Sequence, residues 1–175
     1  AAVLAVGGFA VFNYAYAPEA NAKDAPKSGQ SVADAKDAWA IRCNEESGDV
    51  TEVKRGKCEI YQRQDMKDTG QRVIEFAIGF PDETETARGI FVLPTGILLP
   101  AGVKLQIDDQ KPLEFQVRYC MPNGCVAQVV LNKTVLDMMK KGSEAKVVMA
   151  KPDGAPITIP MPLSGFTKAL GQVQG

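Results

Sequence analysis

The 175-residue sequence contains no histidine. Histidine is the usual base of a Ser-His-Asp or Cys-His site, a common metal ligand and the side chain that titrates near neutral pH. Its absence excludes those catalytic sites, histidine-bound metal or haem, and a histidine pH switch. An excess of one charge is also lacking, because 20 Lys and Arg face 21 Asp and Glu, a formal net charge of −1. With no large basic cluster either, we expect no binding to nucleic acid.

The short motifs of common enzyme classes are missing too. No Gly-x-Ser-x-Gly, P-loop or dinucleotide fingerprint occurs. Carboxylates crowd at Asp108-Asp109, which we interpret as a hairpin turn, and at Asp82, Glu83 and Glu85, an acidic loop without the spaced ligands of a calcium site. We therefore expect no catalysis, no metal and no cofactor. A carbohydrate-active enzyme would need two convergent carboxylates in a cleft.

The N-terminal residues 1–17 are uncharged and mostly apolar, as in an export signal. Ala15-Tyr16-Ala17 resembles a small-x-small cleavage motif, and Ala20-Asn21-Ala22 is a second candidate. Two outcomes stay open: cleavage, or retention as a transmembrane anchor. Either outcome places the rest of the chain outside the cytosol. We expect a periplasmic protein that is anchored in the inner membrane, or secreted if the segment is cleaved.

Residues 18–38 have a different character. Ala, Lys, Asp, Pro, Ser and Gly are mixed here without an apolar period, and Val32 is the only aliphatic side chain larger than alanine. This composition predicts a flexible linker. One folded domain is then expected over residues 39–175.

From Trp39 onward, short segments of alternating apolar and polar residues are separated by turn residues, which indicates strands. The nine expected strands are 38–43, 57–62, 72–80, 89–93, 103–107, 113–120, 125–131, 145–149 and 157–161. Helical spacing predicts two short helices, 133–141 and 164–174, the second capped by Ser164. The predicted fold is mainly β, an antiparallel sandwich or barrel-like domain with one or two short helices, preceded by the apolar N-terminal helix.

Four cysteines stand at Cys43, Cys58, Cys120 and Cys125. An even number behind an export signal favours two disulfides, for which three pairings are possible. Cys120 and Cys125 bracket Met-Pro-Asn-Gly, so they should face each other across a hairpin, and Cys43 and Cys58 then pair by elimination. The alternatives are zinc, which would need two tight cysteine pairs, and a redox centre, which would need Cys-x-x-Cys at a helix start.

The segment 89–103 is unusually apolar and repeats Leu-Pro-x-Gly twice. It either plugs one end of the core or forms an exposed ridge that docks on a partner or a membrane. Replacing Leu98 by Asp separates the two, because only a plug would unfold. The candidate partner-binding residues are Leu93, Pro94, Ile97, Leu98, Leu99 and Pro100.

Five motifs occur in a family-specific order. They are Trp39 shortly before Cys43; Cys58-Glu-Ile-Tyr-Gln; Leu93-Pro-Thr-Gly-Ile-Leu-Leu-Pro-Ala-Gly-Val with Ile107-Asp108; Arg118-Tyr-Cys-Met-Pro-Asn-Gly-Cys-Val-Ala; and Leu163-Ser-Gly-Phe-Thr-Lys-Ala-Leu. Together they resemble the invasion associated locus B family over nearly all of 38–172. The resemblance implies a secreted or periplasmic β-sandwich protein of alphaproteobacteria, named after erythrocyte invasion by one pathogen, and implies no reaction.

The sequence thus predicts a non-catalytic periplasmic or secreted interaction module. We expect a protein partner, in a membrane complex or on an envelope or host surface, and membrane attachment through residues 1–17 if these are uncleaved. Two alternatives are an accessory subunit of an inner-membrane complex and a carboxylate-using carbohydrate-active enzyme.

Overall fold

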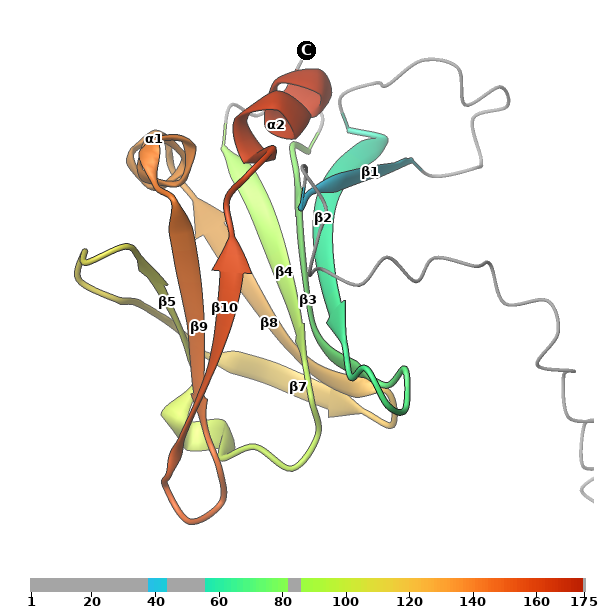
Figure 1. The fold of residues 1–175 in the computed structure, drawn as a ribbon, viewed down its shortest axis with the longest axis vertical. Coiled ribbons are helices and arrows are strands. Elements are labelled where there is room, and N and C mark those ends of the chain that lie inside the picture. The colour runs from blue at the N-terminus through green and yellow to red at the C-terminus, as the bar shows by residue number, and fades with distance from the viewer. Residues whose placement is uncertain (1–37, 44–55, 82–85, 175) are drawn as a thin grey trace, which may run out of the picture.

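The structure is a computed structural model, and the residues that it describes form one domain (Figure 1). It describes residues 38–43, 56–81 and 86–174. The expected apolar segment 1–17, all of the expected linker except Ala38, and the acidic loop 82–85 lie outside the described residues. Within them, no helix is long and apolar enough to cross a membrane.

Two antiparallel sheets form the domain. The larger contains β1 (Ala40–Cys43), β2 (Cys58–Asp65), β3 (Arg72–Gly79), β4 (Ala87–Leu93), β8 (Gly124–Leu131) and β7 (Val117–Met121), in that order. The smaller contains β10 (Pro156–Pro162), β9 (Glu144–Ala150), β5 (Val103–Ile107) and β6 (Leu113–Phe115), in that order. This confirms the predicted mainly β antiparallel fold, as an open sandwich and not a closed barrel.

Helices cover one end of the sandwich. The helices α1 (Lys133–Lys141) and α2 (Phe166–Gln174) lie together at the end drawn at the top of Figure 1. In α1 the Asn132 side chain accepts a hydrogen bond from Val135 N at 3.0 Å, which caps the first turn. In α2 the ring of Phe166 meets Trp39 edge-on at 5.0 Å, so this helix closes the top of the core.

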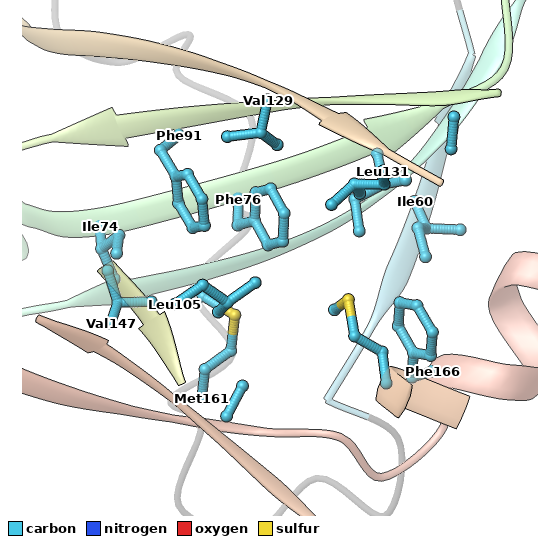
Figure 2. Packing of buried hydrophobic residues seen from close by; sticks show 14 of the residues in the cluster. Ile60, Ile74, Phe76, Phe91, Leu105, Val129, Leu131, Val147, Met161 and Phe166 are labelled. Atoms are coloured by element: carbon cyan, nitrogen blue, oxygen red, sulfur yellow. The ribbon is translucent and has the colours of Figure 1, made fainter. Parts of the chain in front are cut away.

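Side chains from both sheets fill the space between them, because every second residue of each strand points inward. The rings of Phe76 and Phe91 stack with centroids 3.8 Å apart, and Leu105 of the smaller sheet lies across from them (Figure 2). Glycine at position 89 makes room for this stack: a Cβ there would lie 2.7 Å from Phe76 Cε2 and 2.6 Å from Val129 Cγ2. Each fully buried ring contributes about 1.5–3 kcal/mol through burial.

Polar side chains join the sheets at the edge formed by β10. Gln64 Nε2 donates to Pro160 O at 2.5 Å, while Gln62 Nε2 and Trp39 Nε1 each donate to Pro162 O at 3.1 Å. Proline has no backbone N–H, so these positions offer no donor to another chain. The β10 edge is therefore protected against pairing with another strand. Side chains from the larger sheet and from Trp39 bind the carbonyl oxygens of β10.

Two sequence predictions of element boundaries were wrong. The predicted strand 113–120 is two strands, β6 in the smaller sheet and β7 in the larger, which gives ten strands in the described part. The chain changes sheets at Gln116, and alternation of side chains continues across that crossing, so the pattern gave no sign of it. Helix α2 begins at Phe166 after Gly165, whose φ is 80°, so Ser164 stands outside the helix and is not its cap.

Candidate functional site

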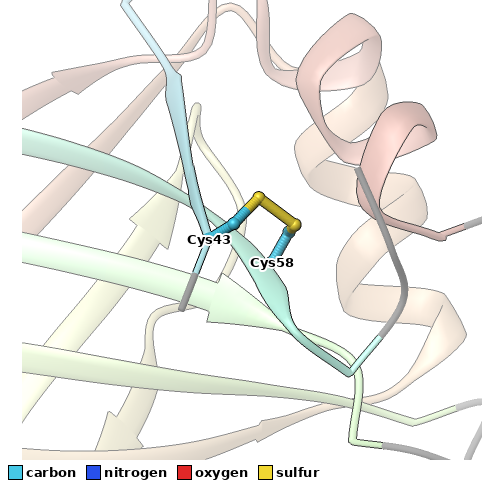
Figure 3. Close-up of a disulfide and its surroundings, with 2 residues drawn as sticks. All are labelled: Cys43 and Cys58. Atoms are coloured by element: carbon cyan, nitrogen blue, oxygen red, sulfur yellow. A yellow bond between two sulfur atoms is a disulfide. The ribbon is translucent and has the colours of Figure 1, made fainter. Parts of the chain in front are cut away.

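The four cysteines form two disulfides between directly facing residues. Cys43 of β1 is bonded to Cys58 of β2 (Figure 3), and Cys120 of β7 to Cys125 of β8. This confirms the predicted pairing and excludes a zinc site made of these cysteines. Each bond joins an edge strand of the larger sheet to its neighbour. The disulfides therefore fix the two edges of that sheet.

The apolar segment between β4 and β5 is divided between the core and the surface. Leu93 is 1% exposed and Ile97 8%, whereas Leu99 is 45% exposed. Pro94 and Leu98 are half-buried and Pro100 is exposed. Leu98 N donates to Ala150 O at 2.8 Å, which ties the segment to the smaller sheet. Of the six candidate partner-binding residues, the outermost are Leu99 and Pro100, at the start of the 3-10 turn η2 (Leu99–Ala101).

Asp108 has a structural role in the turn that follows β5. Its Oδ1 accepts hydrogen bonds from Ser143 N and Glu144 N, both at 3.1 Å, and its φ is 44°. Residues 108 and 109 form the turn between β5 and β6 that the sequence predicted. The Asp108 carboxylate therefore holds the start of β9 in place.

The outer face of the smaller sheet carries lysine and glutamate. Lys104 Nζ lies 2.8 Å from Glu114 Oε1, and Lys146 Nζ lies 3.9 Å from Glu144 Oε1. The hydrogen bond and charge of Lys104 lower the pKa of the Glu114 carboxyl below its usual value. Exposed pairs of this kind contribute little to stability. They are typical of a surface that stays in water.

Basic residues are distributed unequally between the two sheets. The five arginines of the described chain all lie on strands of the larger sheet, namely Arg42, Arg63, Arg72, Arg88 and Arg118. No lysine lies within those strands, whereas the strands of the smaller sheet contain lysine and no arginine. The guanidinium group is less strongly hydrated than an ammonium group and binds planar acceptors with two hydrogen bonds. Arginine is accordingly enriched at protein interfaces and lysine is depleted.

Large apolar side chains are exposed on the outer face of the same sheet. Val130 is 59% exposed, Tyr119 50%, and Ile90 39%. Ile90 faces Gln128 across the β4–β8 pair, and Tyr119 faces Val126 across the β7–β8 pair. These positions alternate with core residues, so they project from one face over three adjacent strands. We call this the β4–β8–β7 patch. It consists of the exposed Ile90, Tyr119, Met121 and Val130 together with the half-buried Val92 and the buried Val126 of the same face.

An ion-pair network lies beside the patch on β1, β2 and β3. Arg42 Nε donates to Glu59 Oε1 at 2.5 Å and its Nη1 to Glu75 Oε1 at 2.6 Å, while Arg72 Nη1 lies 3.6 Å from Glu75 Oε2. The Arg42 guanidinium also covers the Tyr61 ring at 4.7 Å. Partial burial would lower the pKa of Arg42, but its two glutamate partners raise it above the usual value. Glu75, only 6% exposed, thus has two arginine partners at its buried position.

Sequence reasoning did not identify this outer face. It depends on β4 and β8 being neighbours in the sheet, although residues 94–123 separate them in the chain. A usable signal existed in the nearly continuous apolar runs 89–93 and 125–131, because a strand that faces water on one side usually alternates.

Comparisons with known proteins agree on one relationship. The family model described as invasion associated locus B (IalB) protein matches residues 39–174. Invasion protein B of Bartonella bacilliformis is 26% identical over 149 residues, which are 83% of this chain and 76% of that protein. An invasion protein B homolog of Brucella abortus is 27% identical over 155 residues, 85% of this chain and 83% of that protein.

A solved structure has the same fold. The crystal structure of invasion associated protein B from Bartonella henselae superimposes with a TM-score of 0.66 at 25% sequence identity, covering 80% of this chain and 92% of that one. The names of these relatives describe invasion proteins and no enzyme. Since the family model spans nearly the whole described domain, this chain belongs to the invasion associated locus B family.

Proposed function

We propose that this protein is an exported, non-catalytic interaction module that binds a protein partner through the outer face of its six-stranded sheet. One observation supports this most strongly: the arginines and the exposed large apolar side chains gather on that sheet, while the smaller sheet carries lysine–glutamate pairs. Tyrosine, methionine and arginine are the residues that protein interfaces favour.

The patch has the arrangement of an interface. Ile90, Val130 and Tyr119 supply exposed apolar area. Exposed polar side chains lie among them, since Gln128 faces Ile90 and Arg88 faces Val130 in the sheet register. Adjacent strands fix the backbone that carries these side chains, so binding a partner does not have to order a loop. Several large exposed apolar side chains on one face of a protein are a common sign of a binding surface.

Two further features support export. Disulfides persist in oxidising compartments such as the periplasm, and residues 1–17 have the composition of an export signal. We propose a periplasmic location, with the domain tethered to the inner membrane if residues 1–17 are retained and released if they are cleaved. An accessory subunit of an inner-membrane complex is one form of the same proposal, in which the partner is a membrane protein.

The exposed tip at Leu99 and Pro100 is a second proposed contact. It lies at the end of the sandwich opposite the two helices (Figure 1), and its leucine is as exposed as Met121 in the patch, at 45%. The carbohydrate-active alternative gains no support from Asp108, because its carboxylate is bound in the β5–β6 turn.

Photo-crosslinking in intact cells of the native organism tests the proposal. A photoreactive residue is placed at position 90 or 130, and at position 104 or 158 on the opposite face as a control. We expect positions 90 and 130 to yield the same protein adduct, and Val130→Glu to abolish the adduct from position 90. Equal adducts from both faces, or none from 90 and 130, would contradict it.

A further inference from the structure

The outer face of the larger sheet is hollowed at the end near the Cys43–Cys58 disulfide. The hollow has a volume of about 220 Å³, which is below the roughly 300–1,000 Å³ of typical small-molecule pockets. Its lining residues are Gly56, Lys57, Cys58, Glu59, Gly79, Phe80, Pro81, Arg88 and Ile90. It therefore adjoins the β4–β8–β7 patch, with which it shares Ile90.

Gly79 creates the hollow. In the sheet register Glu59 of β2 and Arg88 of β4 face Gly79 of β3 from either side. The missing side chain leaves a gap between two long ones, and a Cβ at position 79 would lie 3.3 Å from Glu59 Cβ. Glu59 and Arg88 both line the hollow on either side of this gap.

Among the residues that the structure describes, the charges lining the hollow sum to a positive value. The Glu59 carboxylate is already bound by Arg42. Arg88 and Lys57 are both exposed, and neither has an ion-pair partner among the residues that the structure describes. In the described part, two cations without an ion-pair partner therefore lie beside a small hollow that is partly apolar, through Phe80, Pro81 and Ile90.

We propose that this hollow binds the side-chain carboxylate of a glutamate or aspartate presented by the partner. Arg88 would bind the carboxylate with two hydrogen bonds, Lys57 would supply a second charge, and Ile90 would contact the methylene groups. The proposal rests on the proposed function, since it names the chemistry that the partner brings to the same face. The apolar wall favours a carboxylate on an aliphatic stem over a free phosphate, which has no apolar part to bury.

The test uses small probes and the full 175-residue chain. The probes are N-acetyl-glutamate amide, which carries one side-chain carboxylate, its neutral isostere N-acetyl-glutamine amide, and inorganic phosphate. Each is titrated at constant ionic strength while backbone amide NMR signals are followed. We expect saturable shifts at Gly79, Cys58 and Ile90 for the glutamate probe, with dissociation constants on the order of millimolar and roughly tenfold weaker binding of the glutamine probe.

Variants make the test specific to the hollow. Arg88→Gln should weaken binding of the glutamate probe roughly tenfold, whereas Lys104→Gln, which removes a lysine on the opposite face, should leave it unchanged. Equal binding of the two isosteres, tighter binding of phosphate, or binding of the glutamate probe that Arg88→Gln leaves unchanged would overturn the proposal. Crosslinks at positions 90 and 130 without carboxylate binding would refute only this inference, and carboxylate binding without those crosslinks would refute only the proposed partner face.

Discussion

Individual residues decide both how the larger sheet packs and what it exposes. Arg42 forms ion pairs with two glutamates, and one of them, Glu75, is buried. A buried carboxylate is stable only where it has partners, so the network has a structural role as well as a place beside the patch. Arg88 and Lys57 have no such role in the described part, and this is why we assign them to binding.

Replacing Arg42 by Met should destabilise the domain by about 1–3 kcal/mol, because Glu75 would keep only Arg72, at 3.6 Å. Urea unfolding measures the change. Lys104→Met, which removes one partner of the exposed pair with Glu114, serves as the control and should leave the free energy of unfolding nearly unchanged. If the two variants lose the same stability, Arg42 is an ordinary surface residue.

Gly89 should not tolerate a methyl group. Its Cβ would lie 2.6 Å from Val129 Cγ2, so Gly89→Ala should cost about 1–3 kcal/mol through overpacking of the aromatic stack. Gly171, where a Cβ would meet nothing within 4 Å, gives the matched control: there alanine should stabilise α2, by up to about 1 kcal/mol. Thermal unfolding of both variants checks the prediction, and a neutral Gly89→Ala would show that the core is less tightly packed than the structure indicates.

At the scale of elements, the sequence pattern predicted correctly those features that depend on contacts between residues close in the chain. Helix α1 has the predicted bounds, with Asn132 before it and Gly142 after it. Each disulfide joins two paired strands that follow one another in the chain. The crossing of the chain at Gln116 and the pairing of β4 with β8 depend on contacts far apart in sequence. Periodicity within a strand carries no information about which sheet or neighbour the strand joins, and the patch could not be predicted for that reason.

In the segment between β4 and β5, substitutions should lower stability at the buried residues and not at the exposed ones. Ile97→Ala should cost about 2–5 kcal/mol, because it opens a cavity at the end of the core. Leu99→Ala should change stability by no more than about 0.5 kcal/mol, since Leu99 is 45% exposed. Chemical denaturation measures the free energy of unfolding of both variants. Similar losses at both positions would show that the whole segment is a plug, and would remove Leu99 as a proposed contact.

At the scale of the molecule, the two faces of the sandwich have different compositions. One carries lysine–glutamate pairs and has a proline-protected edge strand, and the other gathers the arginines, exposed tyrosine and aliphatic side chains. The fold gives no reason for the difference, since either face could be solvated with lysine and glutamate. A binding role for one face explains it.

The proposed compartment makes a prediction about the cysteines. Protein taken from native cells should show no free thiol when it is alkylated under denaturing conditions without reductant, and four after reduction. Mass spectrometry counts the added groups. Free thiols in freshly extracted protein would contradict maturation in an oxidising compartment.

The most direct test of the binding face is the size of the complex that the protein forms in its own cell. Wild-type protein, extracted in mild detergent, should migrate on a native gel as an assembly larger than its 18.8 kDa chain. The pair Ile90→Glu and Val130→Glu should reduce it to the free protein, and Lys146→Glu on the opposite face should leave the assembly intact. An assembly that survives the Ile90 and Val130 changes but is lost with Lys146→Glu would place the partner on the other sheet and contradict the account.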